Sequence, residues 1–277
     1  MFEKGFRVHR VSIPSTGRDI SVLVVQPTVN ARPVAQTPGI LWIHGGGYFL
    51  GMPEMVYISR ALDLVRKYGA VVVSPAYRLA GEAPFPAALE DCYAALLFLK
   101  AHANDLGIND SKIMVGGESA GGGLAVATCL LARDLGDVNI AFQMPLYPMI
   151  DDRDTPSSRN NHAPVWNTKR NHRGWDMYLG SLRRGEAPAY AAPARAANLA
   201  GMPPAYTFVG DIEPFRDETL CYVDALNAAG VPASVDLYTG WFHAYDMLLP
   251  FAPKSRLAIA RFECHYLRAV ELYDAPQ

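Results

Sequence analysis

A serine placed between two glycines is the residue whose surroundings best suit covalent chemistry. Residues 117–121 read Gly-Glu-Ser-Ala-Gly, which fits the Gly-x-Ser-x-Gly pattern of a sharp turn between a strand and a helix. Such a turn exposes the hydroxyl of Ser119 at the end of a sheet, and glycine on each side avoids a collision between a Cβ and neighbouring backbone. The positive end of the following helix would face negative charge forming beside this hydroxyl. The pattern predicts a nucleophilic serine.

A glycine-rich turn of this kind has other uses, because it can pack closely or bind phosphate with its backbone amides. A phosphate loop would end in Gly-Lys-Ser or Gly-Lys-Thr, whereas Leu124 follows the glycines at 121–123. We therefore prefer the nucleophile, which requires a base, an acid and an oxyanion hole elsewhere in the chain.

The base is predicted from the order Ser, acid, His that accompanies this turn. His243 follows an alternating segment at 231–238, and of the seven histidines it alone lies in a turn-like loop after the last expected strand. A histidine in such a loop is more often packed or solvated than catalytic. The serine motif upstream nevertheless makes His243 the predicted base.

Three carboxylates compete for the acid, all in the loop after an expected strand at 205–209. Asp211 also suits a hydrogen bond within the loop, and Asp217 also suits the first turn of the next helix, where negative charge complements the dipole. Glu213 lies deepest in the loop, ahead of Pro214, which suits the start of that helix. We favour Glu213 and keep Asp217 as the alternative.

Amides for an oxyanion hole are expected at two places. One is Ala120, the residue after the nucleophile, and the other is the sequence His-Gly-Gly-Gly at residues 44–47, after an apolar run. Adjacent glycines let the backbone turn its N–H groups inward, and they leave no side chain in the way of a substrate. His44 precedes Ser119 in the chain, so its expected task is a hydrogen bond that holds the glycine loop.

Short apolar runs that alternate with helical patterns would position these residues. The expected strands are 6–13, 20–26, 39–43, 70–74, 112–116, 140–146, 205–209 and 231–238, and the expected helices are 54–68, 87–102, 120–135, 216–229 and 254–272. The first two strands indicate an antiparallel hairpin. The remaining alternation predicts an α/β fold with a mostly parallel, doubly wound sheet of about eight strands and helices on both faces.

Residues 151–201 interrupt this alternation. The stretch is polar and aromatic, and it is too long without a core strand for an ordinary loop, so we expect an insertion with short helices that forms a lid. Its Trp166, Trp175 and Tyr178, with Tyr48 from the glycine loop, would either wall a small acyl pocket or form the core of the lid.

Composition limits the compartments and partners of the protein. A formal net charge of −2 without a sustained basic run argues against nucleic acid, and no apolar stretch is long enough to span a membrane. Residues 1–18 carry charges and no apolar core of a secretory signal, so we expect a cytoplasmic protein. We interpret residues 1–277 as a single domain that includes the insertion.

Four cysteines are scattered singly and lack metal-ligand spacing. We expect them to be buried free thiols, and no metal or organic cofactor is predicted. They are Cys92, Cys129, Cys221 and Cys264.

Together these motifs resemble the hormone-sensitive-lipase-like carboxylesterases of the α/β-hydrolase superfamily. The matching segments are residues 44–48, 77–80 with 85–91, 117–121, and 210–218 with His243. The resemblance implies a serine esterase for short-chain, acetyl-like esters, often a homodimer, with a triad of Ser119, Glu213 and His243. By the family's pattern, Gly46 and Gly47 donate to the oxyanion together with Ala120.

The chain departs from the family in three ways. Glu213 stands where the family usually has Asp, Ala244 stands where it usually has Gly, and the region before the first strand is shorter, which leaves residues 151–201 as the main cover. Two alternatives remain open. One is an amide or formamide hydrolase on the same triad, and the other is a ligand-binding homologue without turnover, which the presence of His243 disfavours.

Overall fold

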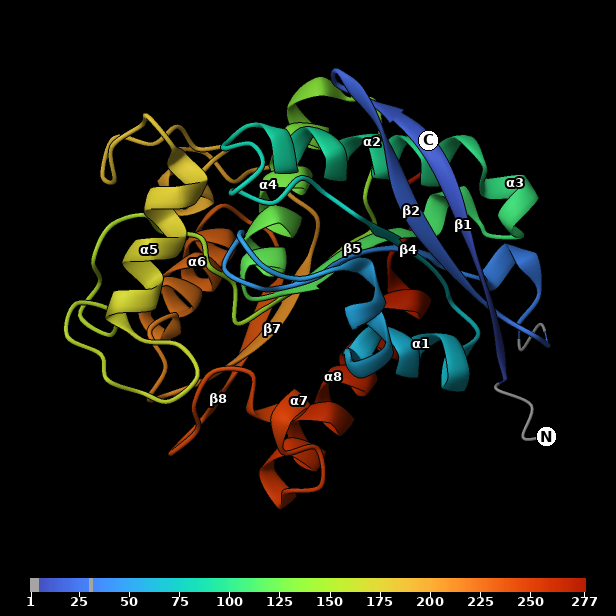
Figure 1. The fold of residues 1–277 in the computed structure, drawn as a ribbon. Coiled ribbons are helices and arrows are strands. Elements are labelled where there is room, and N and C mark those ends of the chain that lie inside the picture. The colour runs from blue at the N-terminus through green and yellow to red at the C-terminus, as the bar shows by residue number, and fades with distance from the viewer. Residues whose placement is uncertain (1–4, 30–31) are drawn as a thin grey trace.

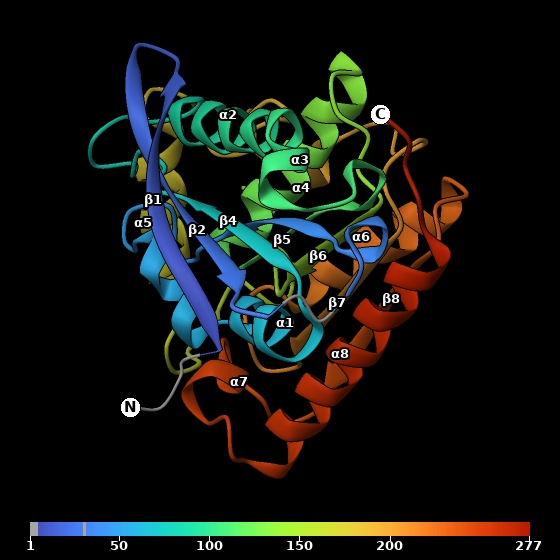
Figure 2. The same ribbon diagram turned by 90° about the vertical axis from the view of Figure 1, so that its right-hand side faces the viewer.

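A single eight-stranded sheet runs through the molecule, with helices on both faces (Figures 1 and 2). The structure is a computed structural model and describes residues 5–29 and 32–277. Residues 1–18 are the segment in which we expect no secretory signal. Residues 1–4 of this segment lie outside the described residues. The strand order is β1-β2-β4-β3-β5-β6-β7-β8; β1 and β2 are antiparallel, and all strands from β4 to β8 in this order are parallel. The expected α/β sheet is confirmed.

The strands follow the predicted apolar runs within a few residues. They are β1 (Phe6–Ser15), β2 (Arg18–Pro27), β3 (Gly39–Ile43), β4 (Val71–Pro75), β5 (Ile113–Glu118), β6 (Phe142–Leu146), β7 (Ala205–Gly210) and β8 (Ala233–Tyr238).

The helices lie between these strands, except for α7 and α8, which follow β8. The α-helices are α1 (Arg60–Tyr68), α2 (Ala87–Ala101), α3 (Ala103–Leu106), α4 (Ala120–Leu135), α5 (Thr168–Leu179), α6 (Arg216–Ala228), α7 (Tyr245–Leu248) and α8 (Pro253–Leu272). Short 3₁₀ helices are η1 (Val34–Gln36), η2 (Pro53–Ile58), η3 (Asp110–Lys112) and η4 (Pro193–Arg195).

The sheet separates two hydrophobic cores. One core packs α2, α4 and α6 against one face, and the other packs α1 and α8 against the opposite face (Figure 2). Every residue of the central strands β3 to β7 is buried, because crossover helices cover both faces of a parallel sheet. The carboxyl ends of these strands therefore share one edge, where loops can bring distant residues together. No helix within residues 5–29 and 32–277 is long and apolar enough to cross a bilayer.

The predicted single helix over residues 54–68 is wrong. The chain forms the 3₁₀ helix η2 and then α1, separated by Ser59 in an extended conformation. The Ser59 hydroxyl accepts a hydrogen bond from the Ala61 amide at 3.1 Å, which makes it the N-cap of α1. Apolar spacing continues through the break, so periodicity alone does not reveal it.

The expectation for the cysteines is half right. All four are free, and Cys92 and Cys129 are buried, but Cys221 and Cys264 are exposed. The buried positions of α6 and α8 recur every three or four residues, and both cysteines fall on the outward side of this repeat.

The insertion at 151–201 follows β6 and contains α5, which lies at the left of Figure 1. Three of its predicted aromatic partners form a packed cluster: Tyr48 stacks on Tyr178 with ring centroids 3.9 Å apart, and Trp175 packs against both. The Tyr48 hydroxyl also donates to the Met149 carbonyl at 2.6 Å. These three side chains therefore form a core between the insertion and the glycine loop. They do not wall the acyl pocket, which was the other expected use.

Candidate active site

The backbone of Ser119 adopts φ 59° and ψ −123°, an unfavourable conformation for a residue with a side chain. Its neighbours hold it there. The Ser119 amide donates to the Leu146 carbonyl at 3.0 Å, and the Ser119 carbonyl accepts from the amides of Gly123 at 2.9 Å and Met149 at 3.0 Å. The sharp turn between β5 and α4 is thus fixed by the end of β6 and by the first turn of α4.

The two flanking glycines have the steric role that the motif predicts. A Cβ on Gly117 would lie 2.5 Å from the Ile43 carbonyl oxygen, and a Cβ on Gly121 would lie 2.1 Å from the same atom. Both distances are well inside van der Waals contact with rigid backbone. Close packing of the turn against β3 therefore requires glycine at both positions.

The structure brings Ser119, His243 and Glu213 together at the carboxyl edge of the sheet. Ser119 follows β5, Glu213 follows β7 and His243 follows β8. His243 Nε2 lies 2.8 Å from Ser119 Oγ, and His243 Nδ1 lies 2.5 Å from Glu213 Oε2. The second carboxylate oxygen of Glu213 accepts from the Gly210 amide at 2.9 Å, and this carboxylate is fully buried. The imidazole can thus take the serine proton while Glu213 fixes its orientation.

The competing carboxylates face other partners. Asp217 accepts from the Ser157 amide at 2.8 Å and from Arg216 Nε at 2.7 Å. Burial opposes its ionisation, but these hydrogen bonds outweigh that effect and lower the pKa of Asp217. Asp211 accepts from the Gly240 amide at 2.6 Å, so its hydrogen bond joins the loop after β7 to the loop after β8 and does not stay within its own loop. Glu213 is the carboxylate of this loop that contacts the imidazole.

Two aromatic rings that sequence analysis did not single out hold His243 in place. The edges of Tyr147 and Phe215 meet the imidazole at interplanar angles of 78° and 79°, with centroids 5.0 Å away in each case. Tyr147 directly follows β6, next to the serine strand, and Phe215 is buried at the start of α6. The sequence could have pointed to both residues, because Tyr147 follows β6, the neighbour of β5, and Phe215 follows β7, the neighbour of β8. The order of the strands in the sheet is needed, however, to show that both rings reach the imidazole.

The glycine loop presents its backbone beside Ser119. Gly46 and Gly47 have φ of 121° and 60°, and the Gly46 carbonyl accepts from the Phe49 and Leu50 amides, which closes a tight turn. Across the described part of the chain, the N–H groups of Gly46 and Gly47 have no protein acceptor. Ala120 is the first residue of α4, where the helix leaves its amide without an intrahelical partner. Amides of this kind can serve an oxyanion.

His44 makes a hydrogen bond within this loop. Its Nδ1 lies 2.8 Å from the Gly45 carbonyl oxygen, its ring stacks on Tyr77 at 4.2 Å, and the Tyr77 hydroxyl donates to the His44 carbonyl at 3.0 Å. Burial lowers the pKa of His44 to about 4, so the ring is neutral at pH 7 and donates from Nδ1. His44 thus braces the glycine loop, as expected.

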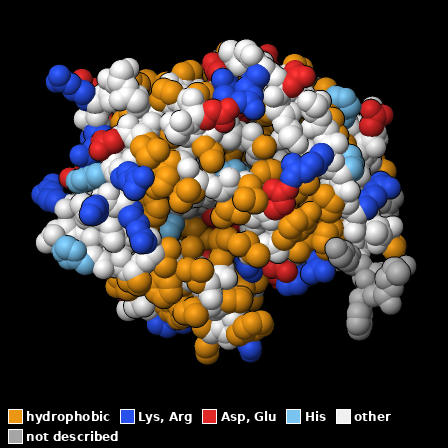
Figure 3. Space-filling view, viewed as in Figure 1, with side chains coloured by type: hydrophobic (Ala, Val, Ile, Leu, Met, Phe, Trp, Pro, Cys, Tyr) orange, Lys and Arg blue, Asp and Glu red, His pale blue; other side chains and the backbone are white. Residues whose placement is uncertain are grey.

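A pocket of about 510 Å³ opens onto Ser119 and His243, and in Figure 3 its mouth is a hollow edged by hydrophobic side chains. Its lining joins the glycine loop to η2, to α7 and to the insertion. Trp166 is the one predicted aromatic of the insertion that lines it, and a Cβ on Gly47 would lie only 2.2 Å from the Trp166 ring. The indole thus lies directly over the glycine loop.

A buried polar cluster lies behind the nucleophile. Glu118 accepts from Trp42 Nε1 at 3.0 Å, while Asp246 accepts from the Tyr147 hydroxyl at 2.9 Å and lies 3.3 Å from Arg60 Nε. Burial, reinforced by the negative charge of Asp246, raises the pKa of Glu118 to about 8. Glu118 is therefore mostly protonated at neutral pH.

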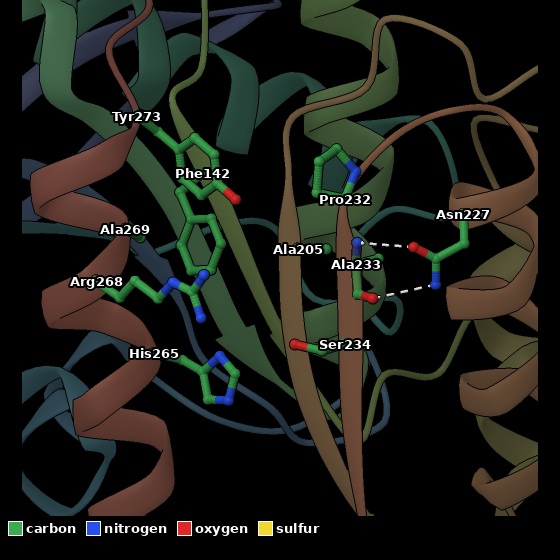
Figure 4. A pocket seen from close by; sticks show the side chains of 10 residues that line it. All are labelled: Phe142, Ala205, Asn227, Pro232, Ala233, Ser234, His265, Arg268, Ala269 and Tyr273. Atoms are coloured by element: carbon green, nitrogen blue, oxygen red, sulfur yellow. Dashed lines mark hydrogen bonds between the residues drawn. The ribbon is translucent and has the colours of Figure 1, made fainter.

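Figure 4 shows another hollow, of about 340 Å³, where β7 and β8 begin and α8 ends. His265 and Arg268 line it, and Asn227 forms two hydrogen bonds with the backbone of Ala233 at 3.1 Å. The hollow lies at the opposite edge of the sheet from Ser119, and its lining contains none of the predicted catalytic residues.

Comparison with known proteins gives consistent matches. A family model described as the α/β hydrolase fold matches residues 40–247. Esterase LipI of Mycobacterium tuberculosis is 38% identical over 213 residues, which are 76% of this chain and 66% of that protein. Carboxylesterase NlhH of the same species is 33% identical over 249 residues, which are 88% of this chain and 76% of that protein.

A solved structure of a bacterial heroin esterase has a TM-score of 0.88 and 38% sequence identity, with 96% of this chain and 85% of that chain covered. The likeness thus extends over nearly the whole chain, and the range matched by the family model includes Ser119, Glu213 and His243. Both kinds of comparison agree with the resemblance that the motifs carry, and this chain belongs to the α/β-hydrolase fold family.

Proposed function

We propose that this protein is a serine carboxylesterase that hydrolyses small carboxylic esters through an acyl-enzyme. The observation that carries the proposal is the continuous contact from Glu213 to His243 at 2.5 Å and from His243 to Ser119 at 2.8 Å, at the base of an apolar pocket. The esterase and carboxylesterase names of the relatives support it.

In the first stage, Ser119 Oγ attacks the ester carbonyl while His243 Nε2 accepts its proton and Glu213 offsets the imidazolium charge. The amides of Gly46, Gly47 and Ala120 donate to the oxyanion that forms on the carbonyl oxygen; each such donor contributes on the order of 10²–10³ in rate. His243 then gives the proton to the leaving alcohol. In the second stage water attacks the acyl-enzyme by the same route, and the acid and free serine are released.

We further propose that the insertion at 151–201 covers the site as a lid. Val165 and Trp166 line the pocket from this segment, and Trp166 lies over Gly47. A bulky ring so close to the oxyanion loop supports a preference for short acyl groups, such as acetyl. The cytoplasmic location expected from the sequence and the homodimer implied by the family resemblance stay proposals, to be tested by cell fractionation and sedimentation.

Replacing the nucleophile tests the proposal. Ser119→Ala is expected to abolish turnover of 4-nitrophenyl acetate, because the attacking oxygen is lost, while the circular dichroism spectrum stays that of the wild type. Unchanged turnover by the folded variant would contradict the esterase assignment. A series of 4-nitrophenyl esters of increasing acyl length tests the short-chain preference.

Amide hydrolysis on the same triad is the second candidate. It needs the same nucleophile and base but a proton delivered to a poorer leaving group. Rates on a matched ester and anilide, measured with wild type and Ser119→Ala, separate the two reactions. A preference for the anilide would change the assignment to an amidase.

A further inference from the structure

Two arginines of the insertion line the pocket beside Trp166. Arg170 and Arg173 lie in the first two turns of α5, three residues apart, so they share one side of the helix. The guanidinium of Arg173 lies over the Phe49 ring, 5.4 Å from its centroid, and Phe49 is itself part of the pocket wall. In Figure 3, Lys and Arg side chains gather over α5 at the left of the hollow.

Neither guanidinium pairs with a carboxylate of residues 5–29 or 32–277. Among the residues that the structure describes, no Asp or Glu oxygen lies within 4.0 Å of Arg170 or Arg173. Two carboxylates of the insertion pair with other cations: Asp154 with His172 at 2.7 Å, and Asp176 of α5 with Arg184 at 3.0 Å. Arg170 donates instead to the Val165 carbonyl.

The helix dipole does not favour arginine at the start of α5. A cation in the first turn opposes the dipole, and Arg170 lies there. The first turn of α5 contains no acidic residue that would offset this, and the N-cap is the neutral Asn167. The helix dipole therefore gives no reason for arginine at position 170, and Arg173 lies one turn further along the same side.

The remaining lining of the pocket does not neutralise them. Glu118 is the only carboxyl group in the lining, and it is buried and mostly protonated at neutral pH. Most of the rest is apolar or glycine, and the other uncharged or weakly charged titratable groups among the described lining residues are the Tyr147 phenol and the triad imidazole. The pocket thus contains the nucleophile Ser119 and, in the part of its wall formed by α5, two positive charges.

We propose that Arg170 and Arg173 select esters that carry an anionic group, such as a carboxylate, several atoms away from the scissile carbonyl. This inference rests on the proposed esterase function and names its substrate class. An arginine pair is suited to the task because each guanidinium offers donors in a plane that matches a carboxylate. The anionic group would supply the charge that the protein leaves uncompensated.

Paired substrates test the proposal and locate the charge. Mono(4-nitrophenyl) adipate against 4-nitrophenyl hexanoate places the anion in the acyl half, and 4-carboxyphenyl acetate against its methyl ester places it in the alcohol half. We expect one of these pairs to show a kcat/KM ratio of about ten in favour of the anion at low salt, the size of effect of a charge-assisted hydrogen bond. The ratio should fall with added NaCl.

The double variant Arg170→Gln/Arg173→Gln should lose this ratio, and Arg173→Lys should keep part of it. Lys169→Gln is the matched control, because Lys169 is an exposed cation of the same helical turn outside the pocket lining. It should leave the ratio unchanged.

Equal losses on the charged and neutral esters would mean that the arginines only support the wall, and would overturn the proposal. So would neutral esters that turn over as well as both anionic ones in the wild type. Lack of turnover on all four esters would instead overturn the esterase assignment itself.

Discussion

Glu213 occupies a position where the family usually has the shorter aspartate, and its surroundings explain how the extra methylene is accommodated. One carboxylate oxygen is fixed by the Gly210 amide at 2.9 Å, so the other is held 2.5 Å from His243 Nδ1. This hydrogen bond holds the carboxylate of Glu213 against Gly210, the last residue of β7. The longer side chain is therefore as fixed as a shorter one would be.

Glu213→Gln is expected to lower kcat by about 10³–10⁴, because the amide can neither offset the imidazolium nor enforce the right tautomer. Asp217→Asn should keep most of the activity, since Asp217 contacts Ser157 and Arg216 rather than the imidazole. Steady-state rates on 4-nitrophenyl acetate check both variants. A larger loss in Asp217→Asn would transfer the acid to that residue.

Ala244 shows at the same scale why the family usually has glycine there. Its φ of 58° and ψ of 28° are in the left-handed region, which costs a residue with a Cβ about 1–2 kcal/mol. The turn directly after His243 is needed to start α7. The chain accepts this strain in order to place the imidazole between β8 and α7.

At the scale of elements, the insertion is tied to the loop that carries Glu213. The Ser157 hydroxyl donates to the Pro214 carbonyl at 2.7 Å and accepts from the Asp217 amide at 3.1 Å, and Asn161 Nδ2 donates to the Ile212 carbonyl at 2.9 Å. The segment that lines the pocket is therefore hydrogen-bonded directly to the segment that orients the base.

Ser157→Ala should lower the free energy of unfolding by about 1–2 kcal/mol, because it leaves a buried carbonyl and amide without partners. It should also lower kcat, since the Glu213 loop loses part of its support. Urea unfolding and kcat measure the two effects, with Ser12→Ala on the exposed face of β1 as control. A variant with lost stability but wild-type kcat would show that the tie does not reach the base.

Elements were more predictable from the sequence than contacts between them. The alternation of buried runs and helices, and the glycines of the serine turn, follow from local chemistry that the sequence displays. The break at Ser59 was missed because apolar spacing is alike on both sides of it. Tyr147 and Phe215 were missed because their contact with His243 depends on the order of strands in the sheet, which no local pattern encodes.

At the scale of the whole molecule, the buried polar cluster behind the nucleophile brings together residues from four separate elements. Glu118 ends β5, Trp42 belongs to β3, Arg60 begins α1, and Asp246 lies in α7. Burial raises the pKa of Asp246 as well as that of Glu118, although Arg60 opposes the shift for both. The fold thus prefers at least one of these carboxyl groups protonated, and its stability must depend on pH.

The sign of this dependence follows from the direction of the shift. A carboxyl group whose pKa is raised by folding binds its proton more tightly in the native state, so its contribution is complete below the unfolded value of 4.5 and is lost as pH rises through about 8. The free energy of unfolding of the wild type should therefore fall between pH 5 and 9.

Glu118→Gln removes the titrating group and keeps an oxygen that can accept from Trp42, so its stability should be close to the wild type at pH 5 and higher at pH 9. Urea unfolding across this range measures the difference, and the exposed Glu271→Gln in α8 controls for charge removal alone. Parallel curves for wild type and Glu118→Gln would mean that Glu118 is ionised in the native state at neutral pH, and that the positive wall of the pocket faces a compensating charge after all.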